Sequence, residues 1–261
     1  MFNTNVILLT SAIFAFCESA AILEKISKKC GLSDSECQQS LYRTIAKEVA
    51  DNGLPDLGIP KIDPFEIKNT ELSVLGMIKF TMTDGTAKGF KTCSGVTFKN
   101  DIENQRTAVE LVCDLFTIEG DYKMESTPTL LALAGGINVH GEGKASVAIE
   151  KLKLNMDFAT EVKKLEDGEL HFQILPENSS YTFEVLGKAT FAADNIFVGK
   201  QDISTVAVNI FNENWEFISK TFGKTVVDKA LEVFYLHVQK FFTSVPAKDL
   251  TSDDVSSYVK S

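Results

Sequence analysis

The chain has 261 residues, of which 36 are acidic and 26 basic, so its formal net charge is −10 at neutral pH. An acidic surface is repelled by phosphate backbones and anionic lipid headgroups, which argues against nucleic acid and anionic membranes as partners. The length is enough to bury one sizeable core, and no long linker or low-complexity stretch interrupts residues 20–261, so we expect a single domain there.

The N-terminus begins with an almost continuously apolar run from Val6 to Phe16. This run is too short to span a bilayer, and it has the length of a signal-peptide hydrophobic region. Ser19 or Ala21 could serve the signal peptidase, although no Lys or Arg precedes the run. An uncleaved membrane anchor is the alternative, but no stop-transfer flank follows. We therefore predict a signal peptide over residues 1–19, a secreted, extracellular protein and no stable membrane insertion.

The cysteines support an oxidising compartment. Cys17 lies in the segment that we expect to be removed, which leaves an even set: Cys30, Cys37, Cys93 and Cys113. An even set in a secreted chain predicts disulfides, and three connectivities are open. We favour the nearest-neighbour pairing, Cys30 with Cys37 and Cys93 with Cys113. The spacing of the cysteines does not fit a metal site, and the histidines His140, His171 and His237 are isolated from one another. We therefore predict no metal and no cofactor.

A helix is expected at residues 34–51. Ser33 to Glu36 has capping-box spacing, and apolar residues recur at helical intervals until Asn52-Gly53 ends the run. Three prolines follow within a short stretch, which forbids a helix and indicates an extended connection: Pro55, Pro60 and Pro64.

Beyond residue 66 the apolar period changes to two, most clearly from Lys151 to Phe158. Similar alternating runs predict further strands: Leu72–Met82, Val109–Ile118, Ala145–Ile149, Leu170–Ile174, Tyr181–Val185 and Val206–Ile210. Turn signals separate the runs: Asp84-Gly85, Glu119-Gly120-Asp121, Gly141-Glu142-Gly143, Asp167-Gly168 and Asn178-Ser179. Consecutive strands with short turns indicate an antiparallel meander.

The last third returns to helical spacing from about Asn214 to Ser244, before Pro246. A helix of this length would extend roughly 46 Å at 1.5 Å per residue. A sheet can cover such a helix only if it is long and strongly curved. The predicted fold class is therefore α+β, with a long C-terminal α-helix wrapped by a highly curved antiparallel β-sheet.

Three segments resemble the takeout and juvenile-hormone-binding protein family of insects. They are the Cys30 and Cys37 pair followed by a helix, the Gly53–Phe65 segment GLPDLGIPKIDPF, and Asn212-Glu-Asn-Trp215 with the later Phe241–Pro246. The resemblance implies an apolar tunnel beside the helix, filled by one elongated lipid-like ligand. Cys93 and Cys113 depart from the pattern, because the hormone-binding branch of the family places its second bridge nearer the C-terminus.

Candidate residues for lining such a tunnel are mostly aromatic, and each could equally be ordinary core: Phe80, Phe98, Phe172, Phe183, Trp215, Phe222 and the small Ala230. Tyr122 and Tyr181 could add one orienting hydrogen bond to a ligand carbonyl, ester or epoxide. Asn178 begins the sequon Asn178-Ser179-Ser180 and is a candidate glycosylation site.

No catalytic motif is found. The chain has no G-x-S-x-G or H-E-x-x-H sequence, and Gly143-Lys144 lacks the following Ser or Thr of a phosphate-binding loop. His140 and Glu142 could share a strand face, but they lack a partner nucleophile. The leading hypothesis is a monomeric, non-enzymatic carrier of a hydrophobic small molecule. The alternatives are an extracellular interaction protein without ligand and an ester hydrolase with an unrecognised site.

Overall fold

The computed structural model of the protein describes residues 29–259, except for the side chains at 95 and 96. The predicted signal peptide at 1–19 lies outside the described residues.

One antiparallel sheet dominates the described chain. Its strands are β1 (Phe65–Val74), β2 (Ile78–Lys88), β3 (Cys93–Asp101), β4 (Arg106–Ser126), β5 (Val139–Lys164), β6 (Leu170–Val185), β7 (Ala189–Ala193), β8 (Ile196–Val198) and β9 (Gln201–Asp202). They run in the order β1-β2-β4-β5-β8-β9, with β3 on β4 and with β6 and β7 on β5. The long central strands β4 and β5 thus hold all the others together.

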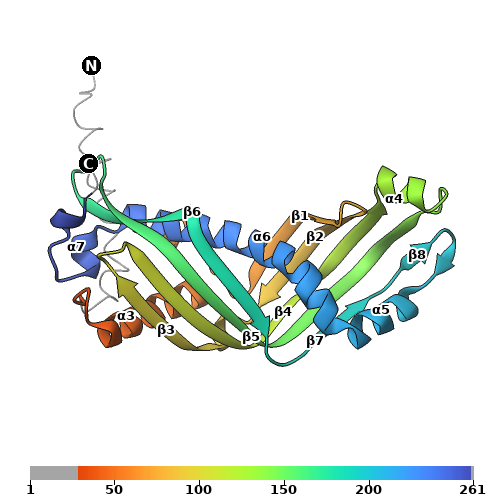
Figure 1. Cartoon of the computed structure of the whole chain (residues 1–261), viewed down its shortest axis with the longest axis horizontal. Coiled ribbons are helices and arrows are strands. Elements are labelled where there is room, and N and C mark those ends of the chain that lie inside the picture. The colour runs from red at the N-terminus through yellow and green to blue at the C-terminus, as the bar shows by residue number, and fades with distance from the viewer. Residues whose placement is uncertain (1–28, 260–261) are drawn as a thin grey trace, which may run out of the picture.

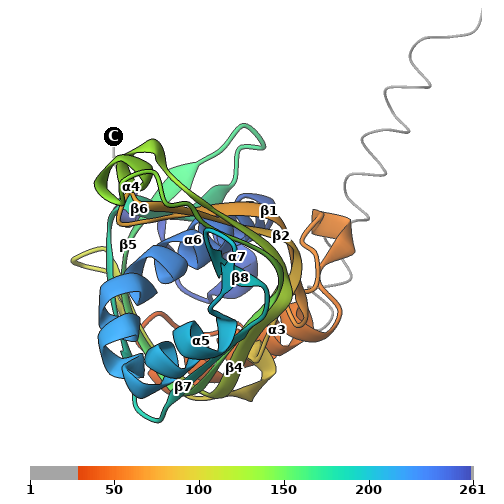
Figure 2. The same cartoon turned by 90° about the vertical axis from the view of Figure 1, so that its right-hand side faces the viewer.

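The helices lie at the ends of the sheet and along it. They are α3 (Ser35–Asp51), α4 (Pro128–Leu133), α5 (Ser204–Glu213), α6 (Trp215–Ser244) and α7 (Ala247–Leu250), with short 3-10 turns η1 (Pro55–Leu57), η2 (Phe90–Thr92) and η3 (Ser256–Tyr258). Figure 1 shows an elongated molecule in which α6 runs along the curved sheet, and Figure 2 shows the strands curling around that helix. The predicted fold class is confirmed.

The two ends of the molecule differ, and we name them by their helices. The proximal end holds α3 and α7, and the distal end holds α4, α5 and β8 (Figure 1). At the proximal end α3 packs against the last turns of α6 in a dense apolar cluster that includes Leu41, Ile45, Phe241 and Val245. This end is therefore closed by a solid core.

The predicted helix at 34–51 is confirmed as α3, but its cap is one residue later than the capping-box reading of Ser33. Asp34 is the N-cap, and its carboxylate accepts a hydrogen bond from the Cys37 backbone N–H at 3.0 Å. A carboxylate is also better placed than a hydroxyl to interact with the partial positive charge of a helix N-terminus.

Two glycines predicted to mark turns instead lie within strands. Gly85 and Gly120 face each other across the β2–β4 pairing, beside a register shift between Met82 and Asp84. A Cβ added to Gly120 would lie 2.4 Å from the Gly85 Cα, so the two backbones approach too closely for larger residues. The predicted turns at Asp84-Gly85 and Glu119-Gly120-Asp121 are therefore wrong.

Other strand boundaries also change. The predicted strand Leu72–Met82 is in fact a hairpin, which turns at Leu75 and Gly76 between β1 and β2. The predicted turn at Gly141-Glu142-Gly143 lies inside β5, where a Cβ on Gly141 would meet the Tyr122 hydroxyl at 2.6 Å. Glycine was needed for close packing at these points and not for a turn.

The predicted strands Leu170–Ile174 and Tyr181–Val185 form one strand, β6. Between them the pairing with β5 shifts at Asp157 and Ala159, so residues 176–179 form an irregular segment and not a hairpin turn. Asn178 is exposed there, and its backbone carbonyl accepts a hydrogen bond from Arg106 at 2.9 Å.

The predicted strand Val206–Ile210 is wrong, because this segment belongs to helix α5. Its apolar residues alternate, but Val206 and Ile210 also satisfy the four-residue spacing of a helix. The Asn212 side-chain amide fixes the helix against β7: it accepts from the Phe191 N–H at 2.8 Å and donates to the Phe191 carbonyl at 2.9 Å. The Asn212 amide thus makes the two hydrogen bonds with the Phe191 backbone that a neighbouring strand would otherwise make.

Both predicted disulfides are present. Cys30 is bonded to Cys37, and Cys93 is bonded to Cys113, its direct partner in the β3–β4 ladder. Within residues 29–259 no helix is long and apolar enough to cross a membrane. The same residues contain no group of three or more His, Cys, Asp or Glu side chains arranged to hold a metal ion.

Candidate ligand-binding site

The sheet face that meets α6 is apolar along much of its length. Two apolar clusters lie on this face. The first packs directly on α6, and the second reaches α6 through Phe183, whose ring would lie 2.6 Å from a Cβ added to Gly223. The sheet residues of the two clusters are Val109, Leu111, Met156, Phe158, Ile174 and Tyr181, then Phe65, Ile67, Ala87, Phe116, Ile118, Ile149, Leu152, Leu154, Phe183 and Val185. In β5 the residues between them, Lys153, Asn155 and Asp157, point to the other side of the sheet, so the face toward α6 suits an apolar guest.

Helix α6 lies across the opening of the curved sheet. It contacts β6 and β7, which pair with β5, and it also contacts β1, the strand at the opposite edge of the sheet, together with η1 just before β1. On the η1 side the Lys240 ammonium donates to the Gly58 carbonyl at 2.9 Å. The helix face between these two sets of contacts therefore points toward the middle of the sheet, at β4 and β5.

Ala230 is on this inward face. It follows Val227 by three positions and precedes Phe234 by four, and both of these side chains pack on the sheet cluster. Residues at such spacings share one side of a helix. Ala230 is nevertheless exposed, whereas its neighbour Leu231 is buried. A small, exposed residue on the inward face is what an open space beside the helix would produce.

The other predicted lining residues do not gather in one place. Phe172 packs edge-on against Phe242 in the proximal core, and Phe98 stacks on Tyr42 of α3 at 4.3 Å between ring centroids. Phe183 lies at the contact of β6 with α6. Phe80 stacks on Tyr122 toward the distal end at 5.4 Å. Phe98 and Phe172 thus contribute to closing the proximal end.

Trp215 and Phe222 lie in the first turns of α6, near the distal end, and both are half-buried. With Ala230 they place three of the predicted lining residues along one helix. Their role as ligand contacts stays a prediction.

The two predicted tyrosine donors already have partners. The Tyr122 hydroxyl donates to the Asp194 carbonyl at 2.8 Å, and the Tyr181 hydroxyl donates to the Asp228 carboxylate. Burial, with the nearby carboxylates of Asp194 and Asp202, raises the pKa of Tyr122 to about 12. Each hydroxyl has a single proton to donate, so either tyrosine could serve a ligand only by exchanging its present partner.

One ionisable side chain on α6 is pushed toward its neutral form. Burial, and secondly the charge of Lys240, lowers the pKa of His237. A neutral imidazole adds no charge to the space beside the helix, which agrees with the uncharged sheet face.

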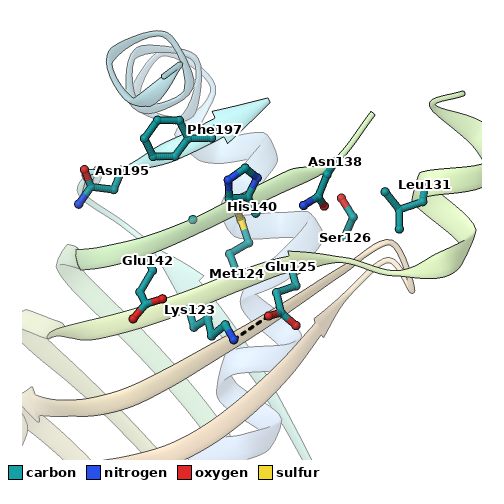
Figure 3. Close-up of a pocket in the computed structure, with 11 residues that line it drawn as sticks. Lys123, Met124, Glu125, Ser126, Leu131, Asn138, His140, Glu142, Asn195 and Phe197 are labelled. Carbon is teal, nitrogen blue, oxygen red and sulfur yellow. Dashed lines mark ion pairs between the residues drawn. The ribbon is translucent and has the colours of Figure 1, made fainter. Parts of the chain in front are cut away.

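A separate pocket of about 680 Å³ lies at the distal end (Figure 3). Its lining is mixed and partly charged: Lys123, Met124, Glu125, Ser126, Leu131, Asn138, His140, Gly141, Glu142, Asn195 and Phe197. His140 stacks on Phe197 at 5.5 Å, and its Nδ1 is buried without a partner among the described residues. The pocket shares no residue with the apolar face described above, so the two are different features.

The proline-rich segment predicted as an extended connection has mainly structural roles. The buried Asp63 carboxylate accepts hydrogen bonds from the backbone N–H groups of Gly89 and Lys91 at 3.2 and 2.8 Å. Gly58 adopts the left-handed conformation that ends η1. Asp63 thus joins the segment to the η2 turn between β2 and β3, and the Gly58 carbonyl joins it to Lys240 of α6.

Sequence reasoning did not single out the aliphatic part of the apolar face. Leu111, Leu152 and Leu154 lie on the same face as the aromatic candidates. The alternation in β5 from Lys151 to Phe158 already contained this signal, because every second residue of a strand points to the same side.

These features define a class of protein in which an elongated sheet curls around one long helix and presents an apolar inner face to it. The sequence model described as "Haemolymph juvenile hormone binding protein (JHBP)" matches residues 6–252. The chain therefore belongs to the haemolymph juvenile hormone binding protein family.

One solved structure supports this fold. The crystal structure of Takeout 1 from Epiphyas postvittana is similar with a TM-score of 0.72 and 24% identity, over 86% of this chain and 99% of that one. A lipopolysaccharide binding protein reaches a TM-score of only 0.39 at 10% identity, over 81% of this chain and 39% of that one. No curated protein sequence matches the chain.

Proposed function

We propose that the protein is a secreted, non-enzymatic carrier of one elongated hydrophobic small molecule, held between α6 and the apolar sheet face. A terpenoid, a fatty acid derivative or a related lipid has the required chemistry. Membership of a family described by hormone binding in haemolymph supports a carrier, and two disulfides agree with an oxidising compartment.

The observation that carries the proposal is Ala230, a small exposed residue on the inward face of α6 between side chains that pack on the sheet. A packed interior leaves few spaces larger than a water molecule. Open space beside an uncharged, aromatic and aliphatic wall would hold an apolar guest by burial and dispersion.

The magnitude is adequate for a carrier. A chain of about 12 buried methylenes gives roughly 10 kcal/mol at about 0.8 kcal/mol each, before the costs of association. Half of that value would still correspond to a dissociation constant below about 1 mM.

Titration with a fluorescent long-chain fatty acid tests this function. We expect saturable binding with one probe per chain, because the helix offers one continuous inward face. Unlabelled terpenoid and fatty-acyl compounds should displace the probe. An absence of saturable binding by delipidated, folded protein would favour the alternative, an extracellular interaction protein whose interior is filled by its own side chains.

A further inference from the structure

The distal end carries two apolar hairpin tips that nothing in the described chain covers. The first is the β1–β2 turn, where Leu75 and Met77 are 66% and 37% exposed. The second is the β4–β5 connection through α4, where Leu133 and Ile137 are 71% and 53% exposed. We call these four residues the distal tips.

The two tips form one surface. Thr127, at the start of the second tip, donates its backbone N–H to the Met77 carbonyl and its hydroxyl to the Gly76 carbonyl, both at 2.8 Å. The β8–β9 turn joins them, since the Gly199 N–H donates to the Asn138 carbonyl at 2.7 Å. Figure 1 shows this group at the opposite end of the molecule from α3 and α7.

Folding does not explain the apolar residue at the first tip. Leu75 has φ 52° and Gly76 has φ 67°, and the Met77 N–H donates to the Val74 carbonyl at 3.0 Å. A turn with two positive φ values favours Asn or Gly at its first central position, and a leucine there is strained. The chain therefore keeps an unfavourable, exposed leucine at the point of the hairpin.

The tips are also uncharged. No Asp, Glu, Lys, Arg or His occurs between Glu71 and Lys79, or between Glu125 and His140, in a chain in which 24% of residues are charged. Behind the tips Lys79 pairs with Glu71 and Lys123 pairs with Glu125, each at 2.7 Å, and the β8–β9 turn that joins the tips adds one exposed charge of each sign, Lys200 and Asp202. Neither a strongly anionic nor a cationic partner is matched by this surface.

We propose that the distal tips dock on a phospholipid surface without net charge, such as a phosphatidylcholine layer. The tips project from the ends of hairpins and are not grooves, so they suit insertion between headgroups better than capture of a peptide. Apolar tips with uncharged flanks gain free energy by entering the headgroup and acyl boundary. Docking would bring the distal end of α6 to the lipid surface, where the carrier would exchange its hydrophobic ligand. The exchange step rests on the proposed function.

Vesicle flotation tests the docking. We expect the protein, purified in its secreted form, to float with phosphatidylcholine vesicles, with little dependence on salt and with weaker binding when anionic lipid is added. The double variant L75N/L133N should partition at least about ten-fold less. Leu75→Asn creates an Asn-Gly turn that suits the backbone, so a loss of flotation would not come from misfolding.

Leu236→Asn is the matched control. Leu236 is 66% exposed, as is Leu75, but it is on α6 away from the tips. Equal loss of flotation in L236N, or no flotation of the parent, would overturn the proposal. A parent protein that is dimeric in vesicle-free buffer, together with a double variant that is monomeric there, would also overturn it, because the tips would then bind a second copy of the chain.

A gain-of-signal variant provides a second measurement. Leu133→Trp keeps the tip apolar, and its fluorescence should be quenched by brominated phosphatidylcholine more than that of Trp215 in the parent.

The flotation and probe-binding experiments together separate the docking proposal from the carrier proposal. Flotation without binding of the fatty-acid probe would reject the carrier and keep the docking surface, whereas probe binding without flotation or quenching would do the reverse.

Discussion

Ala230→Phe is expected to weaken binding of the fluorescent fatty acid by at least about ten-fold, or 1.4 kcal/mol. The new ring would project from the inward face of α6 toward the middle of the sheet, into the volume that we assign to the ligand. The free energy of unfolding should stay nearly constant, since an open space accepts a larger side chain without strain. Probe titration and chemical denaturation of the same sample measure both quantities.

Thr225→Phe is the control for that variant. Thr225 is exposed on α6 five positions before Ala230, which places it on the outer side of the helix. Its replacement should leave probe affinity unchanged. If Ala230→Phe instead lowers the free energy of unfolding by about 1–3 kcal/mol while probe affinity is constant, the site is overpacked core and not a ligand space.

Leu231→Ala should destabilise the fold by about 2–5 kcal/mol, the usual cost of removing a buried leucine. Leu231 is 8% exposed and packs among Met156, Phe158 and Ile174, where α6 meets the sheet. Urea denaturation followed by far-ultraviolet circular dichroism measures the change.

Leu236→Ala, on the exposed side of the same helix, should change stability by no more than about 0.5 kcal/mol. The pair of variants therefore separates loss of packing from loss of helix propensity, because both make the same Leu to Ala replacement. Equal effects would mean that α6 is not anchored to the sheet through Leu231.

Much of the fold could be predicted because the local apolar pattern of α6 continues over the whole length of the helix, and this length constrains the shape of the sheet. The apolar spacing, Pro246 and the Asn214 boundary predicted this helix to within one residue at its start, and its length required a curved sheet. The glycines failed as signals for a different reason. Gly85 and Gly120 permit two strands to approach closely, and a local window cannot distinguish that use from a turn.

The candidate site was predictable only in part. The helical repeat was enough to place Ala230 beside the packed residues of α6, because spacing alone determines which residues share a helix face. The partners of Tyr122 and Tyr181 were not predictable, since Asp194 and Asp228 reach them only through the folded chain. The α5 segment was misread because its anchor, the Asn212 amide on Phe191, is a tertiary contact.

The most direct test of the central claim is organic extraction of the protein, purified gently from its native secretion, followed by mass spectrometry of the extract. The carrier account predicts one elongated hydrophobic compound in about equimolar amount with the chain, and delipidated protein should bind it again. Protein that is folded and free of extractable compound, and that binds no fatty-acid or terpenoid probe, would contradict the account.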